Sequence, residues 1–200
     1  MRALLASLLL LAGCAGAAED EAGSQDSGPA APPSAGAAAA TTAPSEHASG
    51  RVECAAPEET IFSCAMSGGK RLAVCAPQAG AAQYRFGGTS PELVLTGGKW
   101  ATAMYSGGGE AQIEFANGDT VYTVFSRMIR TNFAAGEPNY PAITDGVVIT
   151  RDGKFVALRL CEGGQADMPV QYDAAERAFP QSEDLFTDET IRADPDWANE

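Results

Sequence analysis

The sequence predicts an all-β domain: a single antiparallel β-barrel or sandwich of about nine short strands, held by disulfides and preceded by a disordered tether. Two observations support this fold class. Short runs of alternating apolar and polar residues recur from residue 51 to 170, separated by Gly, Asn and Asp turn signals, and no long amphipathic helix interrupts them. Four of the five cysteines also fall in this region, which is enough for two disulfides. A barrel or a sandwich protects the edges of so many short strands.

The first predicted hairpin contains two of these cysteines. Residues 60–66 and 71–75 flank Ser67-Gly68-Gly69-Lys70. In a two-residue turn Cys64 opposes Ala73 and lies diagonal to Cys75 on the same face. This register allows a Cys64–Cys75 bridge, which would leave Cys54 for Cys161, but the connectivity stays open because four cysteines allow three pairings.

Two further hairpins complete the core of the prediction. Asn117-Gly118 predicts a type I′ turn that pairs Phe115 with Thr120. This register places Ala111, Ile113, Phe115, Tyr122 and Val124 on one face, expected to be core. Residues 151–154 form the next turn, opposing Ile149 with Val156 and Val147 with Leu158. Shorter strands are predicted at residues 82–87, 92–95 and 101–105.

The N-terminus carries a leucine-rich apolar run after Arg2 that is too short to span a bilayer. It ends in Leu11-Ala12-Gly13-Cys14, which resembles a bacterial lipoprotein signal with its lipobox. The resemblance implies that residues 1–13 are a signal peptide and that Cys14 is acylated. The alternative is an ordinary secretory signal cut after residues 15–17. In Gram-negative lipoproteins Ala15 after the acylated Cys implies the outer membrane, here facing the periplasm.

The flanks of the predicted domain differ from it in composition. Residues 14–50 are mostly Ala, Gly, Ser, Thr and Pro with scattered acids, and we interpret them as a disordered tether. Residues 171–200 hold nine Asp and Glu against two Arg. We expect an extended or briefly helical acidic extension whose few apolar residues rest on the domain: Leu185, Phe186, Ile191 and Trp197.

Charge limits the classes of partner. Without residues 1–13, which contain one Arg, the chain keeps 12 Lys and Arg against 26 Asp and Glu, a net charge of about −14. This excess argues against nucleic acid as a partner and against electrostatic binding to anionic lipid. Membrane contact is therefore expected through the acylated Cys14, whose chains suffice for stable anchoring.

The residue types exclude several chemistries. The only histidine, His47, lies outside the predicted domain, and the cysteine spacings contain no C-x-x-C, so neither a zinc site nor a Ser–His or Cys–His pair is expected. Ser67-Gly68-Gly69-Lys70 matches the S-x-x-K pattern of penicillin-recognising enzymes. At a glycine-rich hairpin tip both side chains lie in water, so we predict no catalysis there. No catalytic residue, metal or cofactor is predicted.

One irregular region is a candidate binding loop. Residues 131–145 carry Phe133, Pro138, Tyr140 and Pro141 between two hairpins, and connections of this length are often binding surfaces. The alternative is a Pro-stiffened crossover that straps the end of the barrel.

Two resemblances concern the domain itself. Its segments 58–64, 69–70, 74–75, 84–87 and 92–94 resemble a pattern in small exported bacterial proteins, which implies no activity. Phe62-Ser63-Cys64 is similar to the aromatic-x-Cys strand of the membrane-bound inhibitors of c-type lysozyme, a family of lipoproteins with a disulfide-bearing antiparallel barrel. The Ser-Gly before a Tyr in the family's inhibitory loop is not reproduced, because residues 103–107 carry these elements in another order.

These observations favour a non-enzymatic envelope lipoprotein whose β-domain binds a periplasmic protein or glycan. One alternative is a lysozyme-type inhibitor, since a strongly negative domain complements a basic muramidase. The other is a hydrolase that uses carboxylates alone, which needs two acids facing one cleft. Glu114 falls on the polar face of its strand and gives that alternative little support.

Overall fold

The computed structural model describes residues 50–165 and 167–195, all within one compact unit that spans residues 44–200. The predicted signal peptide, Cys14, the tether up to residue 49, and Trp197 lie outside the described residues. Among the helices that are described, none has the length and apolar character needed to cross a membrane.

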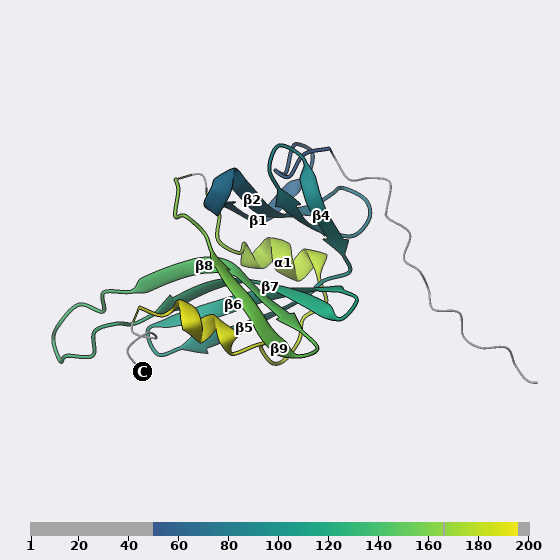
Figure 1. The fold of residues 1–200 in the computed structure, drawn as a ribbon. Helices are drawn as coiled ribbons and strands as arrows, with labels where there is room; N and C mark the ends of the chain where they lie inside the picture. Colours follow the sequence, from purple (N-terminus) through teal and green to yellow (C-terminus); the bar gives the residue numbers. More distant parts are fainter. Residues whose placement is uncertain (1–49, 166, 196–200) are drawn as a thin grey trace, which may run out of the picture. The chain divides into compact units, whose positions relative to one another are not determined.

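Nine strands in the described residues form two antiparallel sheets, each a simple meander (Figure 1). The first sheet contains β1 (Glu59–Met66), β2 (Lys70–Ala76), β3 (Gln83–Gly87) and β4 (Pro91–Thr96). The second contains β5 (Lys99–Tyr105), β6 (Gly108–Asn117), β7 (Thr120–Ile129), β8 (Ala142–Arg151) and β9 (Lys154–Leu160). The predicted all-β antiparallel fold is confirmed, and it is a sandwich rather than a closed barrel.

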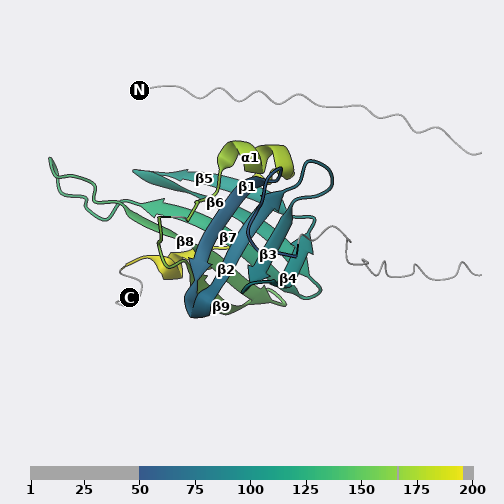
Figure 2. The ribbon, with the colours of Figure 1, turned by 90° about the horizontal axis from the view of Figure 1, so that it is seen from above.

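The two sheets pack face to face with their strands crossing steeply (Figure 2). Helix α1 (Tyr172–Ala178) lies along one open side between them and contributes Ala174 and Ala175 to the common core (Figures 1 and 2). Two short 3₁₀ helices complete the elements: η1 (Ser67–Gly69) in the β1–β2 turn and η2 (Glu189–Ala193) near the C-terminus.

The core forms because alternate residues of each strand face the opposite sheet. The predicted core face of the β6–β7 hairpin is confirmed, since Ala111, Ile113, Phe115, Tyr122 and Val124 all pack in the central cluster. The predicted register is wrong by two residues, because Phe115 pairs with Tyr122 rather than with Thr120. Because side chains alternate between faces with a period of two, an offset of two residues leaves each of them on its predicted face. The predicted core face is therefore unaffected.

The β8–β9 hairpin departs further from its predicted register. Its turn forms at Asp152-Gly153 as expected, but a β-bulge lies between Ile149 and Thr150 in the pairing. Beyond the bulge Val147 pairs with Arg159 instead of Leu158. Leu158 pairs with Val148 and packs on the outer face of the sheet. The bulge therefore turns Arg159 toward the opposite sheet, because one extra residue reverses the facing of all that follow.

The Cys64–Cys75 bridge that the predicted hairpin register allows does not form. Cys54 bonds to Cys75 and Cys64 bonds to Cys161, with Cα atoms 5.4 and 5.7 Å apart. The β1–β2 turn has three residues instead of two, so Cys64 opposes Leu72 rather than Ala73. Cys64 then lies on the core face of the sheet and Cys75 on the outer face. They cannot bond to each other, because a one-residue change of register exchanges the faces.

Candidate functional site

The inner face of the five-stranded sheet continues toward its end as two further rows of residues, the first partly buried and the second exposed. The row next to the core pairs Thr102, Ala111, Ser126 and Asp145 across β5 to β8. The last row, which we call the terminal row, pairs Met104, Gly109, Met128 and Ile143. Met104 is 82%, Met128 40% and Ile143 64% exposed, so apolar side chains from three strands face solvent together.

Asp145 lies on the same face of the sheet, in the row that adjoins the terminal row on the side of the core. Its Oδ1 is buried and has no hydrogen-bond partner among the described residues. Burial raises the pKa of Asp145; a hydrogen bond with the Ser126 hydroxyl opposes the shift, and the negative charge of Asp167 adds to it. No described Lys or Arg forms an ion pair with this carboxylate. Asp145 is therefore a partly desolvated negative charge that lacks a cation.

A cavity of about 220 Å³ joins Asp145 to the terminal row. Its walls are apolar and come from Met104, Met128, Ile143 and the α1 residue Tyr172. Arg127 also borders the cavity, but Glu110 and Asp194 already bind its guanidinium. Apolar walls above a carboxylate complement a long side chain with a positive end, such as Lys or Arg.

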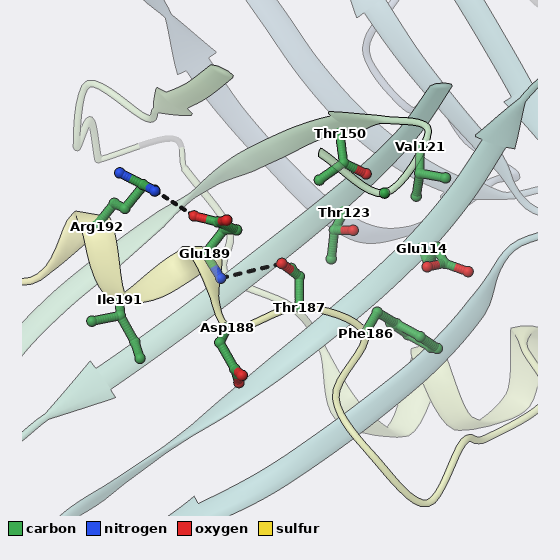
Figure 3. Close-up of a pocket in the computed structure, with 11 residues that line it drawn as sticks. Glu114, Val121, Thr123, Thr150, Phe186, Thr187, Asp188, Glu189, Ile191 and Arg192 are labelled. Atoms are coloured by element: carbon green, nitrogen blue, oxygen red, sulfur yellow. Dashed lines mark hydrogen bonds and ion pairs between the residues drawn. The ribbon is translucent and has the colours of Figure 1, made fainter. Parts of the chain in front are cut away.

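A groove of about 700 Å³ lies on the outer face of the same sheet (Figure 3). Thr123, Thr150 and Glu114 project into it from the strands, and the C-terminal segment closes it from the other side (Figure 3). Two of its acids form ion pairs: Glu114 lies 3.5 Å from the Lys99 ammonium, and Glu189 binds Arg192. Asp188 also lines the groove.

A second outer groove contains a buried charge network centred on Arg127. The guanidinium donates to Glu110 at 2.6 Å and to both carboxylate oxygens of Asp194 at 2.8 and 2.9 Å. Glu110 also accepts hydrogen bonds from the Tyr105 hydroxyl and from the Gln112 amide. Burial, and next the hydrogen bond to Glu110, raise the pKa of Tyr105 to about 12. Each carboxylate oxygen of Glu110 has a donor, so the network holds the C-terminal segment against the sheet.

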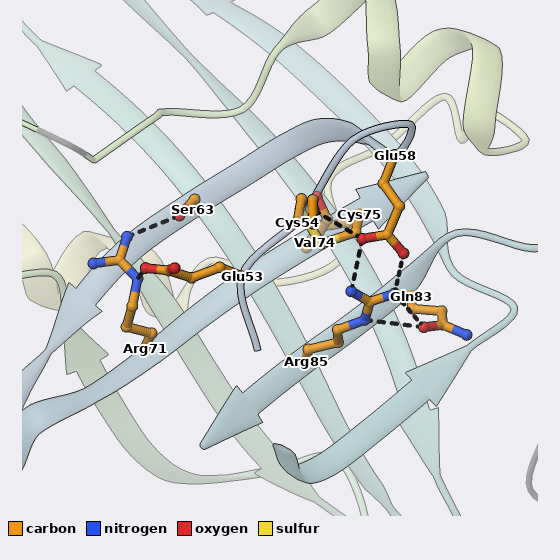
Figure 4. The surroundings of a disulfide bond; sticks show 10 residues. Glu53, Cys54, Glu58, Ser63, Arg71, Val74, Cys75, Gln83 and Arg85 are labelled. Atoms are coloured by element: carbon orange, nitrogen blue, oxygen red, sulfur yellow. Dashed lines mark hydrogen bonds and ion pairs between the residues drawn. A yellow bond between two sulfur atoms is a disulfide. The ribbon is translucent and has the colours of Figure 1, made fainter. Parts of the chain in front are cut away.

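A second buried ion pair holds the segment that precedes β1 against the four-stranded sheet (Figure 4). The fully buried Arg85 donates to both carboxylate oxygens of Glu58, at 3.0 and 2.6 Å, and to Gln83 of its own strand. The hydrogen bond from Arg85 is the main cause that lowers the pKa of Glu58. The Cys54–Cys75 disulfide attaches the same entering segment a few residues earlier (Figure 4). This network also has a structural role.

The two predicted binding-loop residues are both exposed. They lie in residues 130–141, which connect β7 to β8 and extend beyond the sandwich in Figures 1 and 2. The Arg130 guanidinium carbon lies over the Phe133 ring, 5.1 Å from the ring centroid. Phe133 also lines the groove that contains Arg127. Tyr140 is 61% exposed and has a φ of 45°, which is uncommon for a bulky residue. The structure does not bring the two residues into one pocket.

Sequence reasoning did not single out the terminal row or Asp145. The rows become visible only when four strands are aligned, because Met104, Met128 and Ile143 are far apart in the chain. One signal was available: these residues alternate in phase with core residues of their own strands and extend each apolar face toward its end.

No set of three or more His, Cys, Asp or Glu in the described chain is placed to hold a metal ion. No protein-family profile, curated protein or solved structure matches the sequence or the fold.

Proposed function

We propose that this protein is a non-enzymatic lipoprotein of the bacterial envelope, anchored through Cys14, whose β-sandwich binds a basic periplasmic protein. The single observation that carries the proposal is the terminal row with the unpaired Asp145 beneath it. A basic side chain of the partner would enter the cavity with its apolar stem against the methionines and its charge at Asp145.

The shape of the surface favours a protein partner. Apolar side chains gather at one end of the sheet. Gly109 has no side chain in the middle of the terminal row, and the Met104 sulfur packs over it. Methionines adapt to partners of differing shape, and contiguous exposed apolar residues are a mark of interaction sites.

Charge favours a basic partner. The whole chain carries a formal net charge of −13, which accelerates encounter with basic proteins. A muramidase of the lysozyme type is one such partner, and inhibition of it would be a special case of the proposed function.

The test uses the purified, oxidised protein as bait against periplasmic extract, a basic muramidase and peptidoglycan. We expect saturable capture of a basic protein, with an association rate that falls severalfold as salt rises from about 50 to 300 mM. Capture of peptidoglycan alone, or of no macromolecule, would contradict the proposal.

A matched pair of variants locates the surface. Ile143→Ser removes one apolar side chain from the terminal row, and Val156→Ser removes one of similar exposure, 54%, from the neighbouring strand β9. We expect Ile143→Ser to weaken binding at least about tenfold and Val156→Ser to leave it unchanged. Equal effects of the two substitutions would place the interface elsewhere.

A further inference from the structure

A cleft of about 410 Å³ opens between the two sheets, at the end of the inner face opposite the terminal row. Met66, Phe86 and Leu93 line it from the four-stranded sheet, and Val147 and Ile149 line it from the five-stranded sheet. Its volume falls in the range of about 300–1,000 Å³ that is typical of small-molecule sites. The cleft is therefore large enough for a small ligand and mostly apolar.

Two tyrosine hydroxyls in this cleft have no hydrogen-bond partner among residues 50–165 and 167–195. The rings of Tyr84 and Tyr122 lie 5.6 Å apart, and both residues line the cleft. Tyr84 is only 2% exposed, and within the described part of the chain neither hydroxyl makes a hydrogen bond. Neither hydroxyl is among the buried polar atoms that lack a partner, so both stay accessible as donors to a ligand in the cleft.

The mouth of the cleft carries a cation, Arg159, that forms no ion pair within the described residues. The β-bulge of the β8–β9 hairpin places Arg159 opposite Val147 on the inner face, and Arg159 lines the cleft. No described acid forms an ion pair with Arg159, whereas Lys70 at the same mouth is paired with Glu92. The mouth therefore has a net positive charge on a protein whose net charge is −13.

A structural role explains only part of this arrangement. An inward-facing charge on an edge strand discourages pairing with another sheet, and β9 is an edge strand. That role requires neither an apolar cleft behind the charge nor two unpartnered hydroxyls inside it. Bulges that redirect a side chain are frequent beside binding sites.

We propose that the cleft between the sheets binds a single-chain amphipathic anion, an alkyl or aryl group that ends in a carboxylate. The apolar body lies between Phe86, Leu93 and Ile149. The carboxylate accepts hydrogen bonds from the tyrosine hydroxyls and pairs with Arg159 at the mouth. This site is separate from the terminal row, and its test does not depend on a protein partner.

The experiment compares three probes of equal chain length, octanoate, octanol and octylammonium, on the purified, oxidised protein. Binding is measured by calorimetry and by shifts of the Met66 methyl resonance in NMR spectra. We expect octanoate to bind and move the Met66 signal, octanol to bind at least tenfold more weakly, and octylammonium not to bind. Octylammonium binding as tight as octanoate, or octanoate binding without a shift at Met66, would overturn the proposal.

Two variants test the residues. Arg159→Gln should weaken octanoate binding at least tenfold, and Lys154→Gln, the same change of charge on the same strand outside the cleft, should not. Tyr122→Phe keeps the ring and removes one hydroxyl, and it should weaken octanoate severalfold while leaving octanol unchanged. Octanoate affinity that is equal in Arg159→Gln and Lys154→Gln would contradict the assignment of Arg159.

Discussion

Two carboxylates of this protein have pKa values that shift in opposite directions, for reasons that can be separated. Arg85 binds Glu58, and its hydrogen bond to that carboxylate lowers the pKa of Glu58. Asp145 lacks a cation, and burial raises its pKa. Ionisation therefore stabilises the fold at Glu58 and costs stability at Asp145.

The Glu58→Gln substitution should lower the free energy of unfolding by about 3 kcal/mol at pH 7, because it leaves Arg85 buried without a counter-charge. The folded-state pKa of Glu58 is lowered, so its contribution is present above the unfolded value and is lost as pH falls through the folded value. Urea denaturation of both proteins from pH 7 to pH 3 checks this. A difference that stays constant over this range would exclude the ion pair as its cause.

The Asp145→Asn substitution should change the free energy of unfolding in the opposite direction. The folded-state pKa of Asp145 is raised, so the folded protein binds more protons than the unfolded chain above the unfolded pKa, and stability falls as pH rises through that window. At pH 7 we expect Asp145→Asn to raise the free energy of unfolding by about 1 kcal/mol and to weaken the binding of the proposed basic partner. Thermal unfolding at pH 7 and pH 3.5 measures the first effect, with Asp173→Asn on the exposed face of α1 as the control. Loss of stability in Asp145→Asn at pH 7 would show that the carboxylate is satisfied.

At the scale of elements, the two disulfides close loops of very different length. Cys54–Cys75 spans 21 residues and attaches the entering segment to β2, while Cys64–Cys161 spans 97 residues and joins β1 to the end of β9. The second disulfide links the first strand of one sheet to the last strand of the other, so it constrains nearly the whole sandwich.

Removal of Cys64–Cys161 should therefore cost more stability than removal of Cys54–Cys75. Loop-closure entropy gives about 4.7 kcal/mol for the long loop and about 3.3 kcal/mol for the short one. Urea unfolding of the paired Cys→Ala variants measures both values, with the fully reduced wild-type protein as a reference. A larger loss from the short loop would indicate that native packing around Cys54, rather than chain entropy, dominates.

At the scale of the whole molecule, the proposed anchor and the binding surfaces belong to different parts of the chain. Cys14 lies outside the described residues, and both proposed sites lie in the sandwich. If the lipobox is used, the anchor determines where the protein is and the sandwich determines what it binds.

The Cys14→Ser variant should move the protein from the membrane fraction to the soluble fraction, because the remaining chain is too acidic to bind anionic lipid by charge. Fractionation, together with mass spectrometry of the N-terminal peptide, checks both localisation and acylation. Wild-type protein found in the soluble fraction without an acyl group would support the ordinary secretory signal instead.

Much of the fold was predictable from local patterns. Alternation of apolar residues and turn signals is a property of neighbouring residues, so the strands, the hairpins and the core face of β6 and β7 could be predicted. The turn at Asp152-Gly153 was predictable for the same reason. An Asp-Gly pair favours hairpin turns with a positive φ, and both residues adopt one there.

Register and everything that depends on it were decided by tertiary packing. One extra turn residue after β1 exchanged the faces of the cysteines, and one bulge in β9 exchanged Leu158 for Arg159 in the cleft. Neither event has a strong local signal, because several registers satisfy the same alternation and the packing of the two sheets selects among them. The terminal row and the cleft are assembled from residues far apart in the chain, so both arise only in the folded sandwich.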